Sequence, residues 1–458
     1  MTMKFFTVLV CLCALCACSA LRSKYSTPPV ALPASWVGSA LNATVDQAGP
    51  WWMVFDDPVL NALIDQALVR NNDLAAAAIR VRTARLQARL TGTNITPDVS
   101  VSGDTSASRD VESGVISREH GVSASLSYEI DLWGKLAAAR DAAEWEAQAT
   151  DEDRLNTRLT LIGTVAETYW KIAYLSERIA QAEASVVTAR QTLELVSVRH
   201  EAGAVSGLDM VQARQDLAAQ EAVLPALVEE RTQSRMAMSV LFDQPPQTAV
   251  PERGTLPRGA LPEIAAGVPA ELLSRRPDLR AAELRLRASL AEVDQARAEM
   301  YPQLTLTGSL GSSSLELRSV LDNPIATLGA GLVLPFVQWN TVRLNIKVGQ
   351  SQYEEAVVNF RQTLLEALLD VEKALAARQR YEAERSWLEE SLTQARLSEE
   401  MSAERYRAGA ISLQDWLETR ETRRAAEVDL AENRLNRLIS VMDIYLALGG
   451  EAAGVARR

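Results

Sequence analysis

Four stretches of the chain alternate apolar residues with small polar ones, which is the pattern of a β-strand with two different faces. They fall at residues 99–101, 122–128, 304–306 and, less regularly, 328–336, with polar, glycine-rich loops between them. One face carries serine and threonine, unlike the strands of a soluble sandwich. Each strand predicted around these positions is roughly 9–12 residues long, which is enough for a tilted strand to cross a bilayer. The pattern predicts two membrane strands in each half of the chain.

A second pattern places apolar residues at alternating steps of three and four over about six heptads after Trp133. No proline occurs between Trp133 and Pro225. The sequence therefore predicts a helix over about 135–202, roughly 100 Å long at 1.5 Å per residue, and a break or kink at Pro225. A rod of this length must pair with others like it. The alternative is a cytoskeletal coiled coil, but the interleaved membrane-length strands argue against it. The seam residues are Leu155, Leu159, Ile162, Ala166, Tyr169, Ala173, Leu175, Ile179, Ala182, Val186, Ala189, Leu193 and Val196.

The chain repeats itself at an offset of about 205 residues. NDLAA (72–76) recurs as PDLRA (277–281), and RHEAGAVSGLDMVQAR (199–214) recurs as RYRAGAISLQDWLETR (405–420). Pro97 and Pro302 keep the same offset. The sequence predicts a duplication in which each copy is built as helix, strand, strand, long helix, turn and helix.

The N-terminus reads as an export signal. One lysine precedes a short apolar run, and all four cysteines lie within the first eighteen residues. The run is too short to span a bilayer, so we predict a signal peptide over residues 1–17. The ending Leu15-Cys16-Ala17-Cys18 resembles the bacterial lipobox, and small Ala17 makes Cys18 the expected lipidated residue. Ser19 in place of aspartate implies transport to the outer membrane; an ordinary export signal is the alternative.

These features divide the chain into six parts. After the signal peptide come an N-terminal lipidated segment on the outer surface (18–57), a first repeat (58–242) and a linker with six prolines (243–269). A second repeat (270–449) and a C-terminal tail (450–458) follow. The linker is expected to cross the outer surface.

Composition removes several classes of function. The net charge of −12 disfavours a nucleic-acid partner. Two histidines, and no cysteine after residue 18, leave no basis for a metal site, a disulfide framework or a catalytic thiol. No GxGxxG or Walker-type loop is present, so we expect no cofactor and no enzyme activity. No later stretch approaches eighteen consecutive apolar residues, so no transmembrane helix is predicted.

Four strands per chain cannot close into a barrel, and an open sheet edge is not tolerated in lipid. The chain must therefore assemble, and two copies would supply eight strands whereas three would supply twelve. Paired long helices in such a ring would form a helical tube continuous with the strands. The residues alone do not choose the number of subunits.

The segments 49–68, 128–150 and 274–311 are similar to signature stretches of the TolC-like outer-membrane efflux proteins, in order along nearly the whole mature chain. The lipobox and proline-rich linker resemble the lipoprotein branch, the OprM and NodT type. The resemblance implies a homotrimer with a twelve-stranded β-barrel in the outer membrane and an α-helical barrel through the periplasm. It also implies a passive exit duct for drugs and toxic compounds, joined to a periplasmic adaptor and an inner-membrane transporter.

The same resemblance directs attention to the two helix–turn–helix tips, 203–209 and 409–415, as a periplasmic gate. Asp209 and Asp415 stand three residues after a serine and are expected mainly to cap helices, with a pore role as the alternative. The acidic gate position of the family falls on Glu418, where three carboxylates would converge and favour cations. The apolar constriction falls on Gln414, which puts a hydrophobic gate in doubt. Gln212 is the first-copy counterpart of Glu418, so the acidity is not symmetric between the copies.

Two other functions remain open at this stage. The duct could export proteins, as in type I secretion, or the chain could be a lipoprotein that only scaffolds the envelope. A duct conducts ions across a planar bilayer and a scaffold does not.

Overall fold

The structure is a computed structural model, and it describes residues 22–37, 50–262, 269 and 272–450. The fold divides into two compact units. The strand unit comprises Met1–Val30, Ala78–Asp153 and Arg280–Thr363, and the helix unit comprises Ala31–Ala77, Arg154–Leu279 and Leu364–Arg458.

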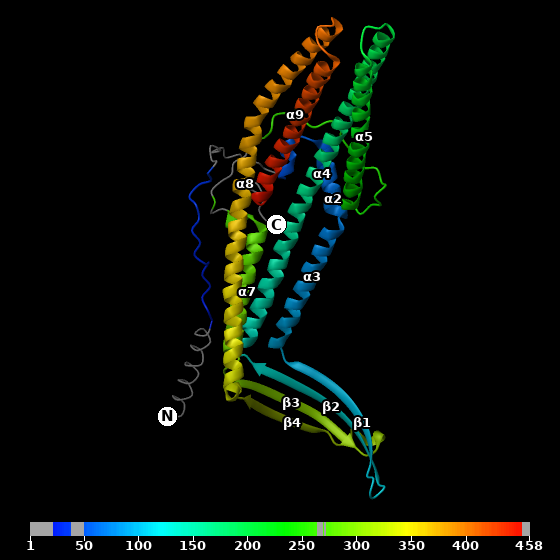
Figure 1. Cartoon of the computed structure of the whole chain (residues 1–458). Coiled ribbons are helices and arrows are strands. Elements are labelled where there is room, and N and C mark those ends of the chain that lie inside the picture. The colour runs from blue at the N-terminus through cyan, green and yellow to red at the C-terminus, as the bar shows by residue number, and fades with distance from the viewer. Residues whose placement is uncertain (1–21, 38–49, 263–268, 270–271, 451–458) are drawn as a thin grey trace. The chain divides into compact units, whose positions relative to one another are not determined.

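Each repeat contains the predicted order of elements (Figure 1). The first follows the short helix η1 (Trp51–Phe55) and contains α2 (Pro58–Arg70), α3 (Asn72–Gly92), β1 (Asp98–Arg109), β2 (Ile116–Ile130), α4 (Lys135–Glu201) and α5 (Gly207–Leu241). The second contains α6 (Leu272–Arg275), α7 (Pro277–Ala298), β3 (Gln303–Ser314), β4 (Ile325–Val333), α8 (Trp339–Arg407) and α9 (Leu413–Ala447). Single-turn helices η2 (Thr93–Ile95), η4 (Leu317–Ser319) and η5 (Pro335–Gln338) join some of them.

The strand unit is built on a four-stranded antiparallel sheet in the order β1-β2-β3-β4. The register places Val101 opposite Ala124 and Ala124 opposite Leu310, so the apolar residues of neighbouring strands share one face. The opposite face is lined by hydroxyl groups, as where Ser100 and Ser125 are hydrogen bonded at 2.7 Å. The sheet therefore has the apolar and polar faces that the alternation predicts.

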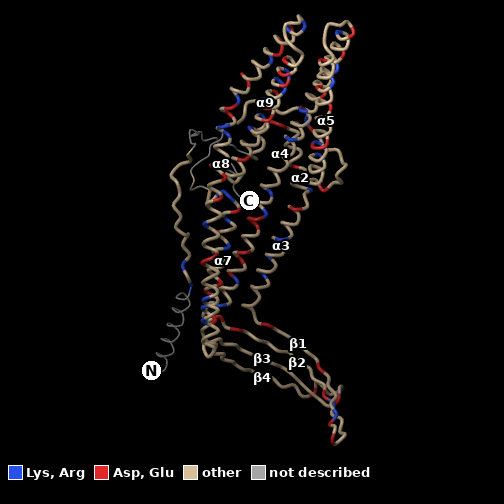
Figure 2. The backbone as a smooth tube through the Cα atoms, viewed as in Figure 1, with Lys and Arg blue, Asp and Glu red and all other residues tan. Residues whose placement is uncertain are grey.

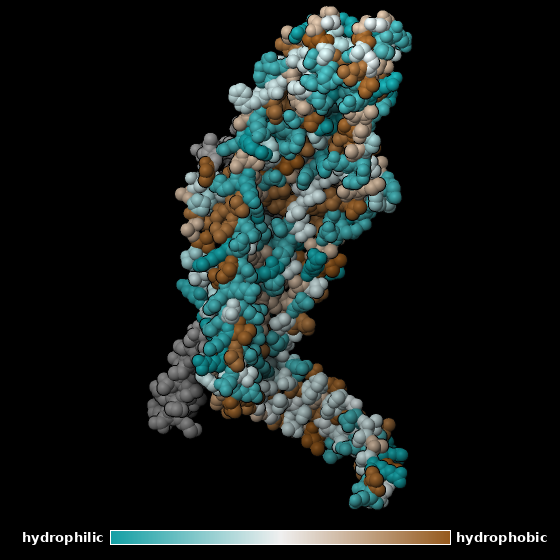
Figure 3. All heavy atoms as spheres, in the orientation of Figure 1, coloured by the Kyte–Doolittle hydropathy of each residue, from teal (hydrophilic) through white to brown (hydrophobic). Residues whose placement is uncertain are grey.

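Charge is distributed unevenly over the strands. β3 and β4 contain no charged residue, and the charged residues of β1 and β2 lie mainly toward their ends. In Figure 2 the strands are mostly uncharged, whereas charged residues are frequent along the helices. Figure 3 shows apolar and weakly polar residues over the strands and strongly hydrophilic residues around the end formed by the β1–β2 turn. An uncharged band of this kind suits contact with lipid.

The long predicted helix is present as α4, which runs without interruption from Lys135 to Glu201. Most of its predicted seam is buried, including Ile162, Tyr169 and Val196. Of the break or kink predicted at Pro225, the break is wrong, because α5 continues through this residue; a kink there stays a prediction. Pro225 lies on an exposed part of α5, so the carbonyl group that loses its amide donor remains accessible to water.

A large core of the described residues lies in the helix unit, where η1, α2, α4, α5 and α9 meet. Trp51 and Trp170 are its largest fully buried side chains. The proline-rich linker forms no helix or strand over 243–262, yet its Leu256 is buried in this core. Its Arg253 pairs with the buried Asp57 at 2.8 Å, and Asp57 also caps α2. The linker is thus packed onto the helix unit rather than being a free spacer.

No helix in the parts of the chain that the structure describes combines the length and apolarity needed to span a membrane.

Candidate functional site

The two helical hairpins of the helix unit end in turns of the same geometry. Gly203 and Gly409 adopt φ values of 70° and 73°, which glycine reaches without a steric penalty. In each turn, the backbone amides of the glycine and of the next residue donate to carbonyl oxygens at the end of the preceding helix. For example, Ala204 N–H donates to Arg199 O at 2.8 Å. Glycine therefore ends α4 and α8 and allows the chain to reverse.

Asp209 and Asp415 occupy capping boxes at the starts of α5 and α9. Asp209 Oδ2 accepts from the amide of Ser206 at 2.8 Å, and Asp415 Oδ2 accepts from the amide of Ser412 at 3.1 Å. In return, each serine hydroxyl accepts from the amide of its aspartate. Hydrogen bonds from Ser412 hold the pKa of Asp415 below its usual value. The capping role is thus observed, and a pore role for either aspartate stays a prediction.

Glu418 and Gln414 lie one turn apart on an exposed face of α9. Gln414 Nε2 donates to Glu418 Oε1 at 2.9 Å, which holds the amide against the carboxylate. The counterpart Gln212 is half-buried on α5. The proposed convergence of three Glu418 carboxylates stays a prediction.

A buried arginine near the tip was missed by sequence reasoning. The side chain of Arg420 on α9 is fully buried, and its Nη1 donates to Thr192 Oγ1 on α4 at 2.9 Å. Its guanidinium also lies 3.7 Å from Asp216 on α5 and 3.8 Å from Glu399 on α8. One side chain of α9 therefore contacts the other three long helices, α4, α5 and α8. Its burial lowers the pKa of Arg420, because desolvation penalises the charged form.

The spacing of apolar residues along α9 was the sequence signal that placed Arg420 on a buried face. Leu413 and Trp416 are buried, and Arg420 follows at the same helical spacing. An arginine on a buried seam requires partners, because an unpaired buried charge is costly. The guanidinium lies 5.4 Å from the Trp416 ring, and Trp416 in turn stacks on Tyr406 at 5.1 Å.

A second arginine connects the ends of the two hairpins. Arg199 of α4 donates to the carbonyl oxygens of Tyr406 and Arg407 at 3.2 and 2.6 Å. Its guanidinium also lies 5.2 Å from the Tyr406 ring. The pair between Arg420 and Asp216 and the contacts of Arg199 together hold the end of α8–α9 against that of α4–α5.

These groups supply hydrogen bonds and charge at the ends of the two hairpins. Within the described residues, no three histidine, cysteine or acidic side chains are grouped so that they could hold a metal ion. The site offers capped helix ends, a buried ion-pair cluster and an exposed carboxylate. Such an arrangement can fix or release helices and can influence the passage of ions.

The antiparallel sheet has one apolar and one polar face, and its pairs of strands alternate along the chain with pairs of long helices. These features define the class of the TolC-like outer-membrane channels. The chain matches the outer membrane efflux protein family over residues 63–242 and 268–450 and belongs to that family. The match consists of two separate stretches, one in each half of the chain.

Relatives and solved structures agree with this assignment. The chain is 36% identical to the pyoverdine export outer membrane protein OpmQ of Pseudomonas putida, covering 94% of this chain and 95% of that protein. It is 32% identical to OpmQ of Pseudomonas aeruginosa, with coverages of 96% and 98%. The crystal structure of the Campylobacter jejuni CmeC outer membrane channel matches with a TM-score of 0.86 at 25% identity, covering 94% of each chain.

The predicted fold class and function are confirmed by these comparisons. The fold is that of the trimeric TolC-like channels, and the protein is an outer-membrane efflux channel, an exit duct for small molecules. Cys18 and the signal peptide lie outside the described residues, so lipidation stays a prediction.

Proposed function

We propose that this chain forms a homotrimer, is anchored in the outer membrane by lipid on Cys18, and extends into the periplasm. It serves as the passive duct of a tripartite pump with a periplasmic adaptor and an inner-membrane transporter. The observation that carries this proposal is the sheet itself. Its outer strands β1 and β4 each pair on one side only among the described residues, and three copies would supply a closed ring of twelve strands.

The mass of the protein in detergent tests the assembly. Native mass spectrometry should give three chains, and a folded monomer or dimer would overturn the trimer. In a planar bilayer the purified protein should conduct ions. A protein that inserts fully and carries no current would instead favour the envelope scaffold.

Mass spectrometry of the N-terminal peptide tests the anchor. We expect the mature chain to begin at an acylated Cys18, and the Cys18→Ser variant to lose the modification. An unmodified start at Ser19 or later would refute lipidation without affecting the channel assignment.

The proposed cargo is small molecules, including drugs and toxic compounds. The hydroxyl-lined face of the sheet supports a water-filled passage. OpmQ is named for pyoverdine export, which makes pyoverdine one candidate cargo for this chain. The experiment is deletion of the gene in its host, followed by complementation and assays of drug sensitivity and pyoverdine release. Loss of secreted protein with unchanged small-molecule export would favour the type I secretion alternative.

A further inference from the structure

A pocket of the helix unit lies between α4, α8 and the end of α9. Its volume is about 570 Å³, within the range of roughly 300–1,000 Å³ that is typical of small-molecule sites. Leu159 of α4, Ala374 of α8 and Leu446 of α9 give it apolar walls. Glu167 of α4 and Asp443 of α9 also line it, and we call these two residues the acid pair. The pocket therefore combines apolar surface with carboxylates, as a site for a small molecule requires.

The packing of α4 against α9 brings the acid pair together. The side chain of Leu446 lies over Gly163, where an added Cβ atom would come within 2.6 Å of it. The two helices run in opposite directions, because late residues of α4 meet early residues of α9 at the tip, as at Thr192 and Arg420. Glu167 follows Gly163 by one turn and Asp443 precedes Leu446 by one turn, so both carboxylates lie on the tip side of this contact.

The two carboxylates of the acid pair act on each other electrostatically. Asp443 is exposed at the mouth of the pocket, but the surrounding helices reduce the hydration of its carboxyl group. This desolvation, together with the neighbouring charge of Glu167, raises the pKa of Asp443 to about 6. Neither carboxylate has an ion pair or a hydrogen bond within the part of the chain that the structure describes. The acid pair thus offers negative charge that no arginine or lysine of the described chain neutralises by direct contact.

Three other charged residues line the same pocket, Arg276, Asp370 and Lys373. Arg276 pairs with Asp278 at 2.7 Å and with Asp370 at 3.3 Å, so its positive charge is compensated. Lys373 follows Asp370 by about one turn of α8. A positively charged ligand is therefore attracted by the acid pair and opposed by Lys373.

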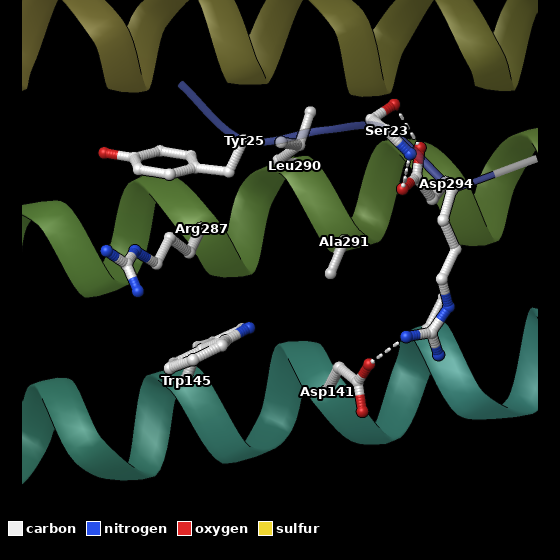
Figure 4. Close-up of a pocket in the computed structure, with 10 residues that line it drawn as sticks. Ser23, Tyr25, Asp141, Trp145, Arg287, Leu290, Ala291 and Asp294 are labelled. Carbon is white, nitrogen blue, oxygen red and sulfur yellow. Dashed lines mark hydrogen bonds and ion pairs between the residues drawn. The ribbon is translucent and has the colours of Figure 1, made fainter. Parts of the chain in front are cut away.

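A pocket of the strand unit provides a contrast, because its charged groups already have partners. Figure 4 shows Arg287 of α7 between Tyr25 and Trp145. The guanidinium lies 4.7 Å from the Tyr25 ring and 5.4 Å from the Trp145 ring. Asp294 in the same pocket pairs with Arg297 at 3.4 Å. The chain's own arginines therefore occupy the ring faces and the carboxylate that would bind a cation there, which is not the case for the acid pair of the helix unit.

The pocket of the helix unit opens on the uncovered face of α4. Val165 and Tyr169 belong to the core that α4 forms with η1 and α2, whereas Gly163 and Glu167 line the pocket. Residues two apart in a helix point about 200° apart, so the pocket lies on the side of α4 away from η1 and α2. In a closed tube these additional elements must lie outside, because they would otherwise fill the passage. In the proposed duct the pocket therefore faces the passage.

We propose that this pocket is a binding site for small cationic amphiphiles in the wall of the passage. The cationic group lies at the acid pair, and the apolar body lies on Leu159, Ala374 and Leu446. The inference rests on the proposed duct, and it adds a class of transported molecule and the residues that would hold it. A site of this kind favours organic cations over organic anions of similar size, because the attraction of the acid pair changes sign with the charge of the ligand.

Fluorescence anisotropy of ethidium, an apolar monovalent cation, tests the site on the full chain in nanodiscs of uncharged lipid. Glu167→Gln combined with Asp443→Asn should weaken ethidium binding at least about tenfold, because both attracting charges are lost. Lys373→Ala should strengthen it, because a like charge is removed. Glu183→Gln, at an exposed acid of α4 outside the pocket, is the matched control and should leave it unchanged. Equal ethidium affinity in the parent and the combined variant would overturn the site.

The anion 1-anilinonaphthalene-8-sulfonate separates loss of charge from loss of the pocket. Its affinity should rise in the combined variant if the pocket remains intact, and a fall for both probes would contradict the assigned role of the acid pair. In the parent, ethidium affinity should fall between about pH 7.5 and about pH 5, because Asp443 takes up a proton as the pH drops through its raised pKa of about 6. Asp443→Asn should remove most of this dependence, and an unchanged pH profile would refute the part assigned to Asp443.

Failure of the site and failure of the duct give different results. All residues that line the pocket belong to one chain, so ethidium binding is measured whatever the number of subunits. A protein that conducts ions in a planar bilayer, but binds ethidium equally with and without the acid pair, would overturn this inference alone. Binding that depends on the acid pair in a protein that carries no current would instead overturn the duct and leave the binding site standing.

Discussion

Replacing Arg420 by alanine should loosen the contact between the two helical hairpins. The side chain of Arg420 is fully buried and donates to Thr192 at 2.9 Å, with Asp216 and Glu399 within 4 Å. Alanine removes this charge, the hydrogen bond and the contact with the ring of Trp416 together.

The magnitude follows from what remains after the substitution. Breaking a buried ion pair by removing one partner costs about 3–5 kcal/mol when a charge is left alone. Here Asp216 keeps Arg424 at 3.3 Å, and Glu399 keeps Arg423. The free-energy cost of Arg420→Ala should therefore lie near the lower end of this range, at about 3 kcal/mol. This cost corresponds to roughly a hundredfold change in the local opening equilibrium.

Amide hydrogen exchange on the folded trimer in detergent measures this opening directly. Peptides around Thr192, Asp216 and Glu399 should exchange about a hundredfold faster in Arg420→Ala, and Arg420→Lys should give an intermediate effect because it keeps the charge but loses the planar fork. Arg396→Ala is the control. Arg396 is 60% exposed and pairs with Glu427 at 3.1 Å, so it should change exchange by no more than about fivefold. Equal exchange in Arg420→Ala and Arg396→Ala would refute the reasoning.

Four further predictions concern the tip and the core. Glu418→Ala should lower the cation preference of the reconstituted channel. Asp415→Ala should leave selectivity unchanged and speed hydrogen exchange of the first turn of α9. A change of selectivity in Asp415→Ala but not in Glu418→Ala would place the gate one turn earlier. Hydrogen bonds lower the pKa of Asp415 in the folded protein. The stabilisation from its cap should therefore be complete at neutral pH and be lost only as the pH falls through this lowered pKa. Hydrogen exchange of the first turn of α9 measures this loss. Gly203→Ala should destabilise the turn by about 1 kcal/mol, because φ there is 70°. Gly207→Ala, at a helical position, should not destabilise it. Equal thermal stability of the Gly203→Ala and Gly207→Ala trimers would count against this prediction. Asp57→Ala removes the cap of α2 and a buried partner of the linker, and it should cost about 2–3 kcal/mol, measured as a lower midpoint of thermal unfolding.

Local patterns were sufficient to predict the elements of this fold. The two-residue alternation around Val101 and Leu306 predicted strands with one apolar face, and the seam through Ile162 and Val196 predicted α4 almost to its observed end. Such periods are visible in sequence because each element exposes one face and buries or shields the other, whatever its partners are. The tip caps were predictable because serine and aspartate three residues apart interact within one helical turn. The duplication was predictable because similar segments recur at a constant offset along the chain.

The contacts that join distant segments depended on the tertiary structure. The partners of Arg420 lie on three other helices, and Arg253 of the linker reaches Asp57 nearly two hundred residues earlier. Asp294 accepts a hydrogen bond from the backbone amide of Ser23, which lies 271 residues earlier in the chain. A sequence shows that a charge falls on a buried face, but it does not show which opposite charge meets it there, because pairing is set by how the long helices align side by side. The continuity of α5 through Pro225 is of the same kind: proline weakens a helix locally, and whether the helix survives depends on the water and the neighbours available to the freed carbonyl group.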